Sequence, residues 1–187
     1  MKAFDRYLQR KRIEQTLSFI TTGNKVLDIG SNYGELFEFY RKKNTPIKGV
    51  GIDPNIEGDS AGNGFTLIKD YFPTQKLTEE GFDAITMLAV LEHIPMDQIP
   101  EFAKNCNRKL KQGGKLVITV PSKTVDHILK MLLFLKLIEG MELEQHYGYD
   151  INMTQPVFEK QGFKQLVHKT FQLGLNNVFV FEKVASV

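Results

Sequence analysis

The sequence predicts a doubly wound α/β fold, in which a mainly parallel sheet of seven strands carries helices on both faces and ends in an antiparallel hairpin. Short apolar, β-branched runs alternate with segments of helical periodicity from residue 25 to residue 122. A glycine turn directly follows the first of these runs, and two strand-like runs close the chain on either side of Gly174. This alternation is typical of a parallel sheet that is covered on both faces.

The first half of the chain begins with apolar residues at helical spacing from Phe4 to Ile20, which predict an N-terminal helix. Three strands and one helix follow, and a glycine-rich loop lies over Gly58–Gly64. The predicted strands are Lys25–Ile29, Ile47–Ile52 and Phe65–Ile68, and the predicted helix is Glu35–Lys43.

The second half of the chain completes the predicted sheet. Phe82–Leu88 is almost continuously apolar, as buried parallel strands are. The pair Gly113 and Gly114 predicts a turn before the next strand. The remaining predicted elements are helices over Met96–Leu110, Val125–Ile138 and Gln155–Gln161, and strands over Lys115–Val120, Gly162–Thr170 and Leu175–Phe181.

Length and composition indicate a single intracellular globular domain. The chain has 187 residues, of which 42% are hydrophobic and 25% charged, and its net charge of +2 gives no general argument for nucleic acid as a partner. Its one cysteine, Cys106, allows neither an intrachain disulfide nor a cysteine-rich metal site. No membrane insertion is expected, because the most apolar run, Ile128–Ile138, is too short and contains two lysines. A start without an apolar signal region favours a cytoplasmic location.

The strongest chemical signal is the sequence VLDIGSNYG over Val26–Gly34. Gly30 and Gly34 bracket a turn where a side chain would obstruct a ligand, and the following helix offers free N–H groups to a carboxylate. Asp28 at the end of the strand can face the amino group of an amino-acid moiety. Asp53 ends the second strand, where an acid accepts hydrogen bonds from ribose hydroxyls. These features predict a nucleoside ligand, which leaves a nicotinamide dehydrogenase as an alternative.

Four motifs in the same order resemble those of the class I S-adenosylmethionine methyltransferases. They are VLDIGSNYG, GVGIDPN from Gly49, FDAITMLAVLEHI from Phe82 and LKQGGKLVITVPS from Leu110. The resemblance covers roughly residues 25 to 122, and the terminal hairpin agrees with it. It implies a Rossmann-like methyltransferase fold, S-adenosyl-L-methionine as the cofactor, and transferase activity.

The resemblance also implies which residues hold the cofactor. The loop over Gly30–Gly34, with Ser31 and Asn32, would bind the methionine part, and Asp53 with Pro54 would bind the ribose. The adenine and the rest of the pocket are assigned to Asp70, Tyr71, Leu88 and Ala89. Asn32 departs from the glycine frequent in the family, although asparagine tolerates left-handed backbone angles.

A general base is needed only if the methyl acceptor is protonated. The candidates are His93, His146 and Tyr147, which follow strand ends. For His93, packing or shaping of the cofactor pocket is the favoured interpretation. For His146 and Tyr147, a substrate contact and a loop hydrogen bond are equally favoured interpretations. No metal is expected, because Ala89 stands where metal-dependent relatives would carry an acid.

We expect residues 1–187 to form one methyltransferase domain, with an N-terminal helix over 1–22 and a candidate substrate lid over 123–150. The apolar stretch in the second segment can instead pack on the sheet or form the contact of a homodimer. The expected acceptor is a small molecule methylated on oxygen or nitrogen, because the fourth strand reads MLAV rather than an NPPY-like tetrad. The alternatives are an RNA or protein methyltransferase that uses the basic N-terminal helix, and a non-catalytic cofactor-binding regulatory or scaffold protein.

Overall fold

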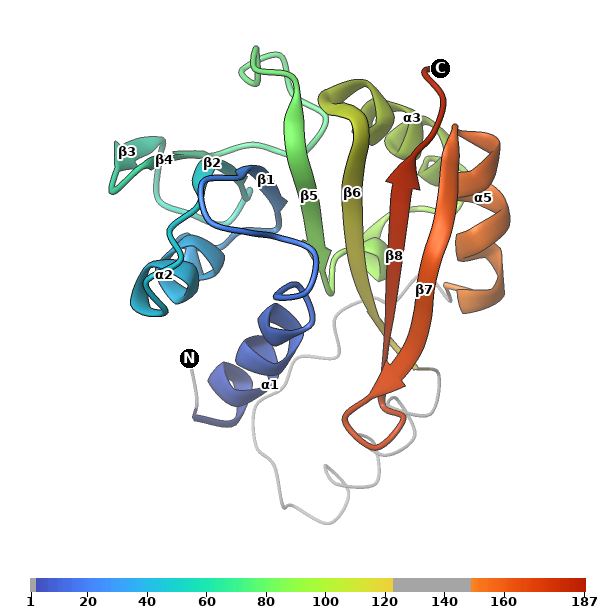
Figure 1. Ribbon diagram of the computed structural model, residues 1–187, viewed down its shortest axis with the longest axis horizontal. Helices are drawn as coiled ribbons and strands as arrows, with labels where there is room; N and C mark the ends of the chain where they lie inside the picture. Colours follow the sequence, from blue (N-terminus) through green and yellow to red (C-terminus); the bar gives the residue numbers. More distant parts are fainter. Residues whose placement is uncertain (1–2, 123–148) are drawn as a thin grey trace.

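The fold is a mixed eight-stranded sheet between two helical layers. The computed structural model describes residues 3–122 and 149–187. Figure 1 shows the sheet, whose strands run in the order β3-β4-β2-β1-β5-β6-β8-β7. The strands are β1 (Lys25–Ile29), β2 (Lys48–Ile52), β3 (Ser60–Gly62), β4 (Phe65–Ile68), β5 (Phe82–Leu88), β6 (Leu110–Pro121), β7 (Phe163–Phe171) and β8 (Asn176–Lys183).

Helices cover both faces of this sheet, which confirms the predicted fold class. The helices α1 (Ala3–Glu14) and α2 (Glu35–Lys42) lie on one face, while α3 (Ile99–Lys109) and α5 (Thr154–Lys160) lie on the other (Figure 1). Two short 3₁₀ turns, η1 (Leu91–His93) and η2 (Ile151–Met153), complete the described elements. The candidate lid over 123–150 lies outside the described residues, apart from its last two.

Each helical layer packs its own hydrophobic cluster against the sheet. On the α1 and α2 side, Ile13, Phe37 and Tyr40 pack with Val26 of β1. On the opposite side, Phe102 of α3 and Phe158 of α5 belong to the larger cluster, which also contains the buried side chains of β5 and β6. Because strand side chains alternate between faces, near-continuously apolar strands such as β5 serve both clusters.

One strand appears where the sequence predicted only a loop. Ser60–Gly62 pairs antiparallel with β4, so the sheet has eight strands rather than seven. The two residues between them, Asn63 and Gly64, both have positive φ, 52° and 86°. An Asn-Gly pair is the preferred sequence for such a two-residue hairpin turn. The glycine-rich composition concealed a specific turn signal.

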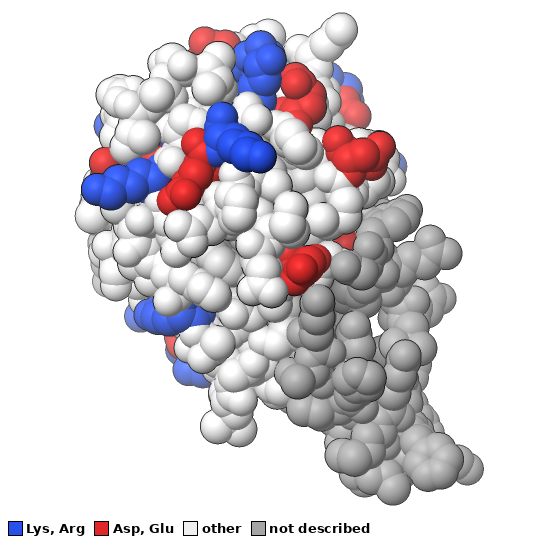
Figure 2. All heavy atoms as spheres, turned by 90° about the vertical axis from the view of Figure 1, so that its right-hand side faces the viewer, with Lys and Arg blue, Asp and Glu red and all other residues white. Residues whose placement is uncertain are grey.

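The edge strand β7 is protected against pairing with another chain. Lys164 and Lys169 lie exposed on it, and its pairing with β8 shifts register between Gln165 and Val167. Charged side chains and bulges of this kind oppose edge-to-edge association. Figure 2, which faces this side, shows charged side chains spaced over an otherwise uncharged surface.

Among residues 3–122 and 149–187, no helix has both the length and the apolar character needed to cross a bilayer.

Asn107 fastens the C-terminal elements to α3, and its replacement by leucine is expected to destabilise the fold by about 2 to 4 kcal/mol. Its fully buried amide nitrogen donates to the carbonyl oxygens of Gln161 and Ala185, both at 2.8 Å. The matched control is Gln112→Leu, since the exposed Gln112 amide makes a similar bond to Val184. Urea unfolding followed by circular dichroism measures both changes. Equal effects of the two substitutions would contradict the assignment.

Candidate cofactor-binding site

The turn between β1 and α2 is built around backbone hydrogen bonds to the neighbouring strand. The N–H groups of Gly30 and Ser31 both donate to the carbonyl oxygen of Ile52, at 2.8 and 3.2 Å. Gly30 and Gly34 have φ angles of 77° and 83°, which side-chain-bearing residues rarely adopt. A Cβ on Gly34 would lie 2.5 Å from the ring of Phe65. Both glycines are therefore required by the backbone path of this loop.

Asn32 takes the left-handed conformation that a glycine would take. Its φ is 47°, and its side-chain amide donates to Glu35 at 3.0 Å. Its backbone N–H donates to the Oδ2 of Asp53 at 2.8 Å, so the loop is tied to the end of β2. The departure from the family pattern at this position thus leaves the turn intact.

The carboxylate of Asp53 accepts hydrogen bonds from two backbone N–H groups, one in the glycine loop and one just after β2. Its Oδ2 accepts the Asn32 N–H and its Oδ1 accepts the N–H of Asn55, both at 2.8 Å. A carboxylate offers about four lone-pair sites, so these bonds leave acceptor capacity for hydroxyl groups. Pro54, half-buried, follows it directly.

Asp28 lies buried at the same edge of the sheet. Its Oδ1 accepts a 2.6 Å hydrogen bond from the hydroxyl of Thr86, the residue directly opposite on β5. Burial, helped by the nearby acids Glu35 and Asp53 and opposed by the hydrogen bond from Thr86, raises the pKa of Asp28 to about 7. The carboxylate is consequently poised to gain from a bound positive charge.

Glu35 is a third acid of this site that the sequence reasoning missed. It is the first residue of α2, and burial raises its pKa while backbone N–H groups oppose the shift. Its Oε2 is buried without a hydrogen-bond partner. Within the described ranges, no lysine or arginine forms an ion pair with Asp28, Glu35 or Asp53. An acid directly after the glycine turn was the sequence signal available for it.

The other residues expected to hold the cofactor are placed at the same carboxyl edge but make local contacts. Asp70, two residues beyond β4, accepts from the N–H of Tyr71 at 2.8 Å and from the hydroxyl of Thr74 at 2.6 Å. These bonds hold the pKa of Asp70 below its usual value. The ring of Tyr71 is 74% exposed. The turn is thus ordered by itself and leaves an aromatic face open.

At the end of β5, Leu88 is half-buried and Ala89 adopts a φ of 60°. The N–H of Ala89 donates to the carbonyl oxygen of Thr119 on β6 at 2.9 Å. Strained angles at residues other than glycine are concentrated at functional sites.

Of the three candidate bases, His93 ends η1 and is half-buried, whereas His146 and Tyr147 lie outside the described residues.

The N-terminal helix lies beside the acids at this edge of the sheet. Figure 1 shows α1 at the lower end of the sheet, where β5 ends. Gln9 donates a side-chain hydrogen bond that lowers the pKa of Glu35, and Arg12 lies beside the buried Glu92 of η1. Burial lowers the pKa of Arg12 and the charge of Glu92 opposes that shift. Glu92 also raises the pKa of Tyr149, which burial brings to about 12. Helix α1 is therefore linked to the site through the hydrogen bond from Gln9 to Glu35.

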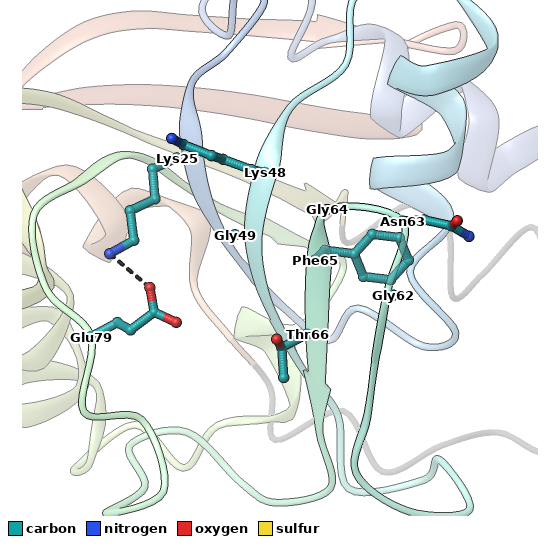
Figure 3. A pocket seen from close by; sticks show the side chains of 9 residues that line it. All are labelled: Lys25, Lys48, Gly49, Gly62, Asn63, Gly64, Phe65, Thr66 and Glu79. Atoms are coloured by element: carbon teal, nitrogen blue, oxygen red, sulfur yellow. Dashed lines mark ion pairs between the residues drawn. The ribbon is translucent and has the colours of Figure 1, made fainter.

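A separate open pocket of about 580 Å³ lies at the opposite edge of the sheet. Figure 3 shows it between the residues that begin β1 and β2, Lys25 and Lys48, and the turn that precedes Phe65. Lys25 forms an ion pair of 2.7 Å with Glu79 across it. Ligands of doubly wound sheets bind at the carboxyl ends of the strands. This pocket at the amino ends is distinct from the cofactor site.

The residues present fit S-adenosylmethionine. A zwitterionic amino-acid moiety needs an acid for its ammonium and N–H groups for its carboxylate, and Asp28 and the first turn of α2 lie on either side of the glycine loop. Asp28 and Asp53 are buried and Glu35 is half-buried, so a bound cation would stabilise their charges, and the ligand carries a sulfonium as well as an ammonium. In the described ranges, no group of three or more histidine, cysteine, aspartate or glutamate side chains could hold a metal ion.

Comparison with known proteins identifies the family of the chain. The family model described as a methyltransferase domain matches residues 1–173. The chain is 30% identical over 132 residues to the mitochondrial ubiquinone biosynthesis O-methyltransferase of Rattus norvegicus, covering 64% of this chain and 37% of that protein. It is 28% identical over 130 residues to the protein of that name from Coxiella burnetii, covering 66% and 52%. The chain thus spans about half or less of these relatives' length.

Solved structures show the same fold. A SAM-dependent methyltransferase from Methanosarcina mazei superimposes with a TM-score of 0.68 at 16% sequence identity, covering 92% of this chain and 98% of that one. Since the two sequences are so different, the agreement concerns the arrangement of strands and helices.

Proposed function

This chain belongs to the family of S-adenosylmethionine-dependent methyltransferases, and from that premise we propose that it transfers the cofactor's methyl group to a hydroxyl group of a small molecule. The observation that carries the proposal is the cluster formed by Asp28, Glu35 and Asp53, which the described part of the chain leaves without a cation. The choice of oxygen as the acceptor atom rests on the matched relatives, which are named O-methyltransferases.

The cofactor supplies an activated methyl group on a sulfonium. The chain's own contribution is then to bind and align, because methyl transfer is an in-line displacement that gains mainly from proximity and orientation. Asp28 would hold the ammonium, Asp53 the ribose, and the ring of Tyr71 would pack on the adenine. His93, half-buried at the end of η1, is the candidate among the described residues for receiving a hydroxyl proton.

A nucleic-acid substrate is disfavoured by how the basic helix uses its charges. Arg10 and Lys11 of α1 form ion pairs with Glu14 of the same helix, at 3.2 and 2.8 Å. Arg12 is half-buried, and the charge of Glu92 opposes the lowering of its pKa by burial. Cations engaged by the chain's own acids are poorly placed to neutralise phosphates. The cytoplasm as location and a homodimer as assembly state remain part of the proposal, the latter testable by sedimentation.

The proposal is tested by incubating the purified chain with S-adenosylmethionine and a panel of phenols, alcohols and amines, while following the release of S-adenosylhomocysteine. We expect release with hydroxyl-bearing acceptors. Release with amines alone would replace oxygen by nitrogen as the acceptor atom. Cofactor binding without turnover of any acceptor would favour the non-catalytic scaffold instead.

A further inference from the structure

A row of side chains crosses four strands on the face of the sheet that carries α1. Asp28 of β1 stands opposite Thr86 of β5, and Thr86 occupies the same face as Val117, its partner on β6. Thr119 is two residues further along β6 and so shares that face. Asn176 begins β8 opposite Pro121 and therefore shares the face of Thr119. The row leads from the acids of the cofactor site towards β8.

At the far end of this row, several polar atoms are buried without partners. The hydroxyl of Thr119 is fully buried and makes no hydrogen bond. The side-chain amide nitrogen of Asn176 donates to the Oε1 of Gln172 at 2.6 Å. This single bond leaves the Oδ1 of Asn176 and the Nε2 of Gln172 unsatisfied. Whichever way the two amides are turned, one acceptor and one donor remain unused.

The neighbouring residue shows that such atoms can be satisfied here. Asn177, which points to the other face, donates to the hydroxyl of Ser122 at 2.9 Å, and its Oδ1 lies 3.0 Å from the Nε2 of His168. On the α1 face, by contrast, the strand register sets Thr119 opposite Val178 and Asn176 opposite Pro121. The buried hydrophobic cluster that includes Val178 is made of Val117, Val178 and Val180, with Phe19, Val167 and Phe171 packed against it. A buried, unpaired polar group destabilises the folded state and therefore calls for an explanation.

The turn that presents Gln172 is strained. Gln172 and Leu173 have φ angles of 51° and 58°, so two successive residues other than glycine are left-handed. Leu173 at the tip is completely exposed. Backbone strain of this kind persists where the surrounding structure uses it, and it is concentrated at ligand-binding positions. The strain therefore belongs to the same end of the sheet as the unpaired atoms.

We propose that Thr119, Asn176 and Gln172 form a subsite that binds a second hydroxyl group of the methyl acceptor, remote from the hydroxyl that is methylated. The proposal rests on the proposed function. All three side chains are uncharged, and the remaining donor and acceptor match the one donor and the acceptor lone pairs of a hydroxyl. Neighbouring strands lie about 4.8 Å apart, so β6 and β8 place the subsite roughly 5 to 10 Å beyond the end of β5. The acceptor is thus an elongated diol.

A matched pair of probes tests this. Para,para′-biphenol has a hydroxyl at each end, and para-phenylphenol has the same ring frame with one hydroxyl only. We expect the protein saturated with S-adenosylhomocysteine to bind biphenol about tenfold more tightly, the worth of roughly one to two buried hydrogen bonds. Calorimetric titration measures both affinities. Equal affinities, or no binding of either compound, would overturn the subsite.

Substitutions of Thr119 distinguish an effect on ligand binding from an effect on the stability of the fold. Thr119→Val removes the hydroxyl at constant shape and should abolish most of the preference for biphenol without lowering the free energy of unfolding, because no intramolecular hydrogen bond is lost. Thr119→Ser should restore the preference. The matched control is Thr86→Val, which removes a buried hydroxyl that is bonded to Asp28 and should therefore lower the urea concentration at which the protein unfolds. An unchanged preference in Thr119→Val would refute the assignment.

Release of S-adenosylhomocysteine tests the proposed transferase activity independently of the subsite. Preferential binding of biphenol without release of S-adenosylhomocysteine from S-adenosylmethionine would support the subsite and contradict the proposed transferase activity. Methylation of phenylphenol and biphenol with equal KM would support the transferase activity and contradict the subsite.

Discussion

Asp53→Ala is expected to weaken binding of S-adenosylmethionine by about a hundredfold or more. The substitution removes a charged acceptor proposed to bind the ribose, and hydrogen bonds to charged groups are worth about 1.5 to 3 kcal/mol. It also frees the N–H groups of Asn32 and Asn55, each of which Asp53 holds at 2.8 Å. The glycine loop thereby loses its tie to β2. Calorimetric titration of the wild type and the variant with S-adenosylmethionine and S-adenosylhomocysteine measures the loss.

Two controls define the meaning of this result. Asp59→Asn changes an exposed acid of the same region that is paired with Lys76, and it should leave cofactor affinity unchanged. NADH should bind neither protein, because the site is assigned to a sulfonium nucleoside. Retention of wild-type affinity in Asp53→Ala would show that the ribose is held elsewhere and would remove β2 from the site.

The sequence predicted the fold around β1, α2 and β2 well because these elements are local. The strand, the glycine turn and the helix that follows are consecutive, so the placement of Asp28, Gly30 and Gly34 follows from their order along the chain. Asp53 is joined to them by the pairing of β1 with β2, which the alternation of elements already implied. The left-handed angle of Asn32 was likewise foreseeable from the tolerance of asparagine for that region.

The acceptor half could not be predicted in the same way. Thr119 and Asn176 share one face of neighbouring strands only because β6 pairs antiparallel with β8 in one particular register. A threonine in an apolar strand and an asparagine after a turn are ordinary in sequence, since both types are common in such places. That their polar atoms are buried and unpaired is a property of the packed structure. The same holds for Glu35, whose buried oxygen is visible only when the helix is set against its neighbours.

Cofactor affinity is expected to depend on pH through Asp28. Burial raises the pKa of Asp28 to about 7, and the groups that face it are Thr86, Glu35 and Asp53. A cation binds the ionised carboxylate, so affinity should fall by up to about tenfold for each pH unit below 7 and level off above it. Titrations of S-adenosylmethionine at about pH 5, 6, 7 and 8 measure this slope. Asp70→Asn is the control, since the pKa of Asp70 is lowered and its titration lies below this range.

Asp28→Asn should abolish the pH dependence and, at about pH 8, should bind the cofactor weakly while unfolding less readily than the wild type. The sign follows from linkage: the folded protein holds the Asp28 proton more tightly than the unfolded chain, whose pKa is near 3.8. The carboxylate therefore destabilises the fold increasingly as pH rises from about 4 to 7, and the neutral amide removes that cost. Urea unfolding of both proteins at about pH 8 measures the difference. A variant that is less stable and still binds normally would mean that Asp28 supports the fold and not the cofactor.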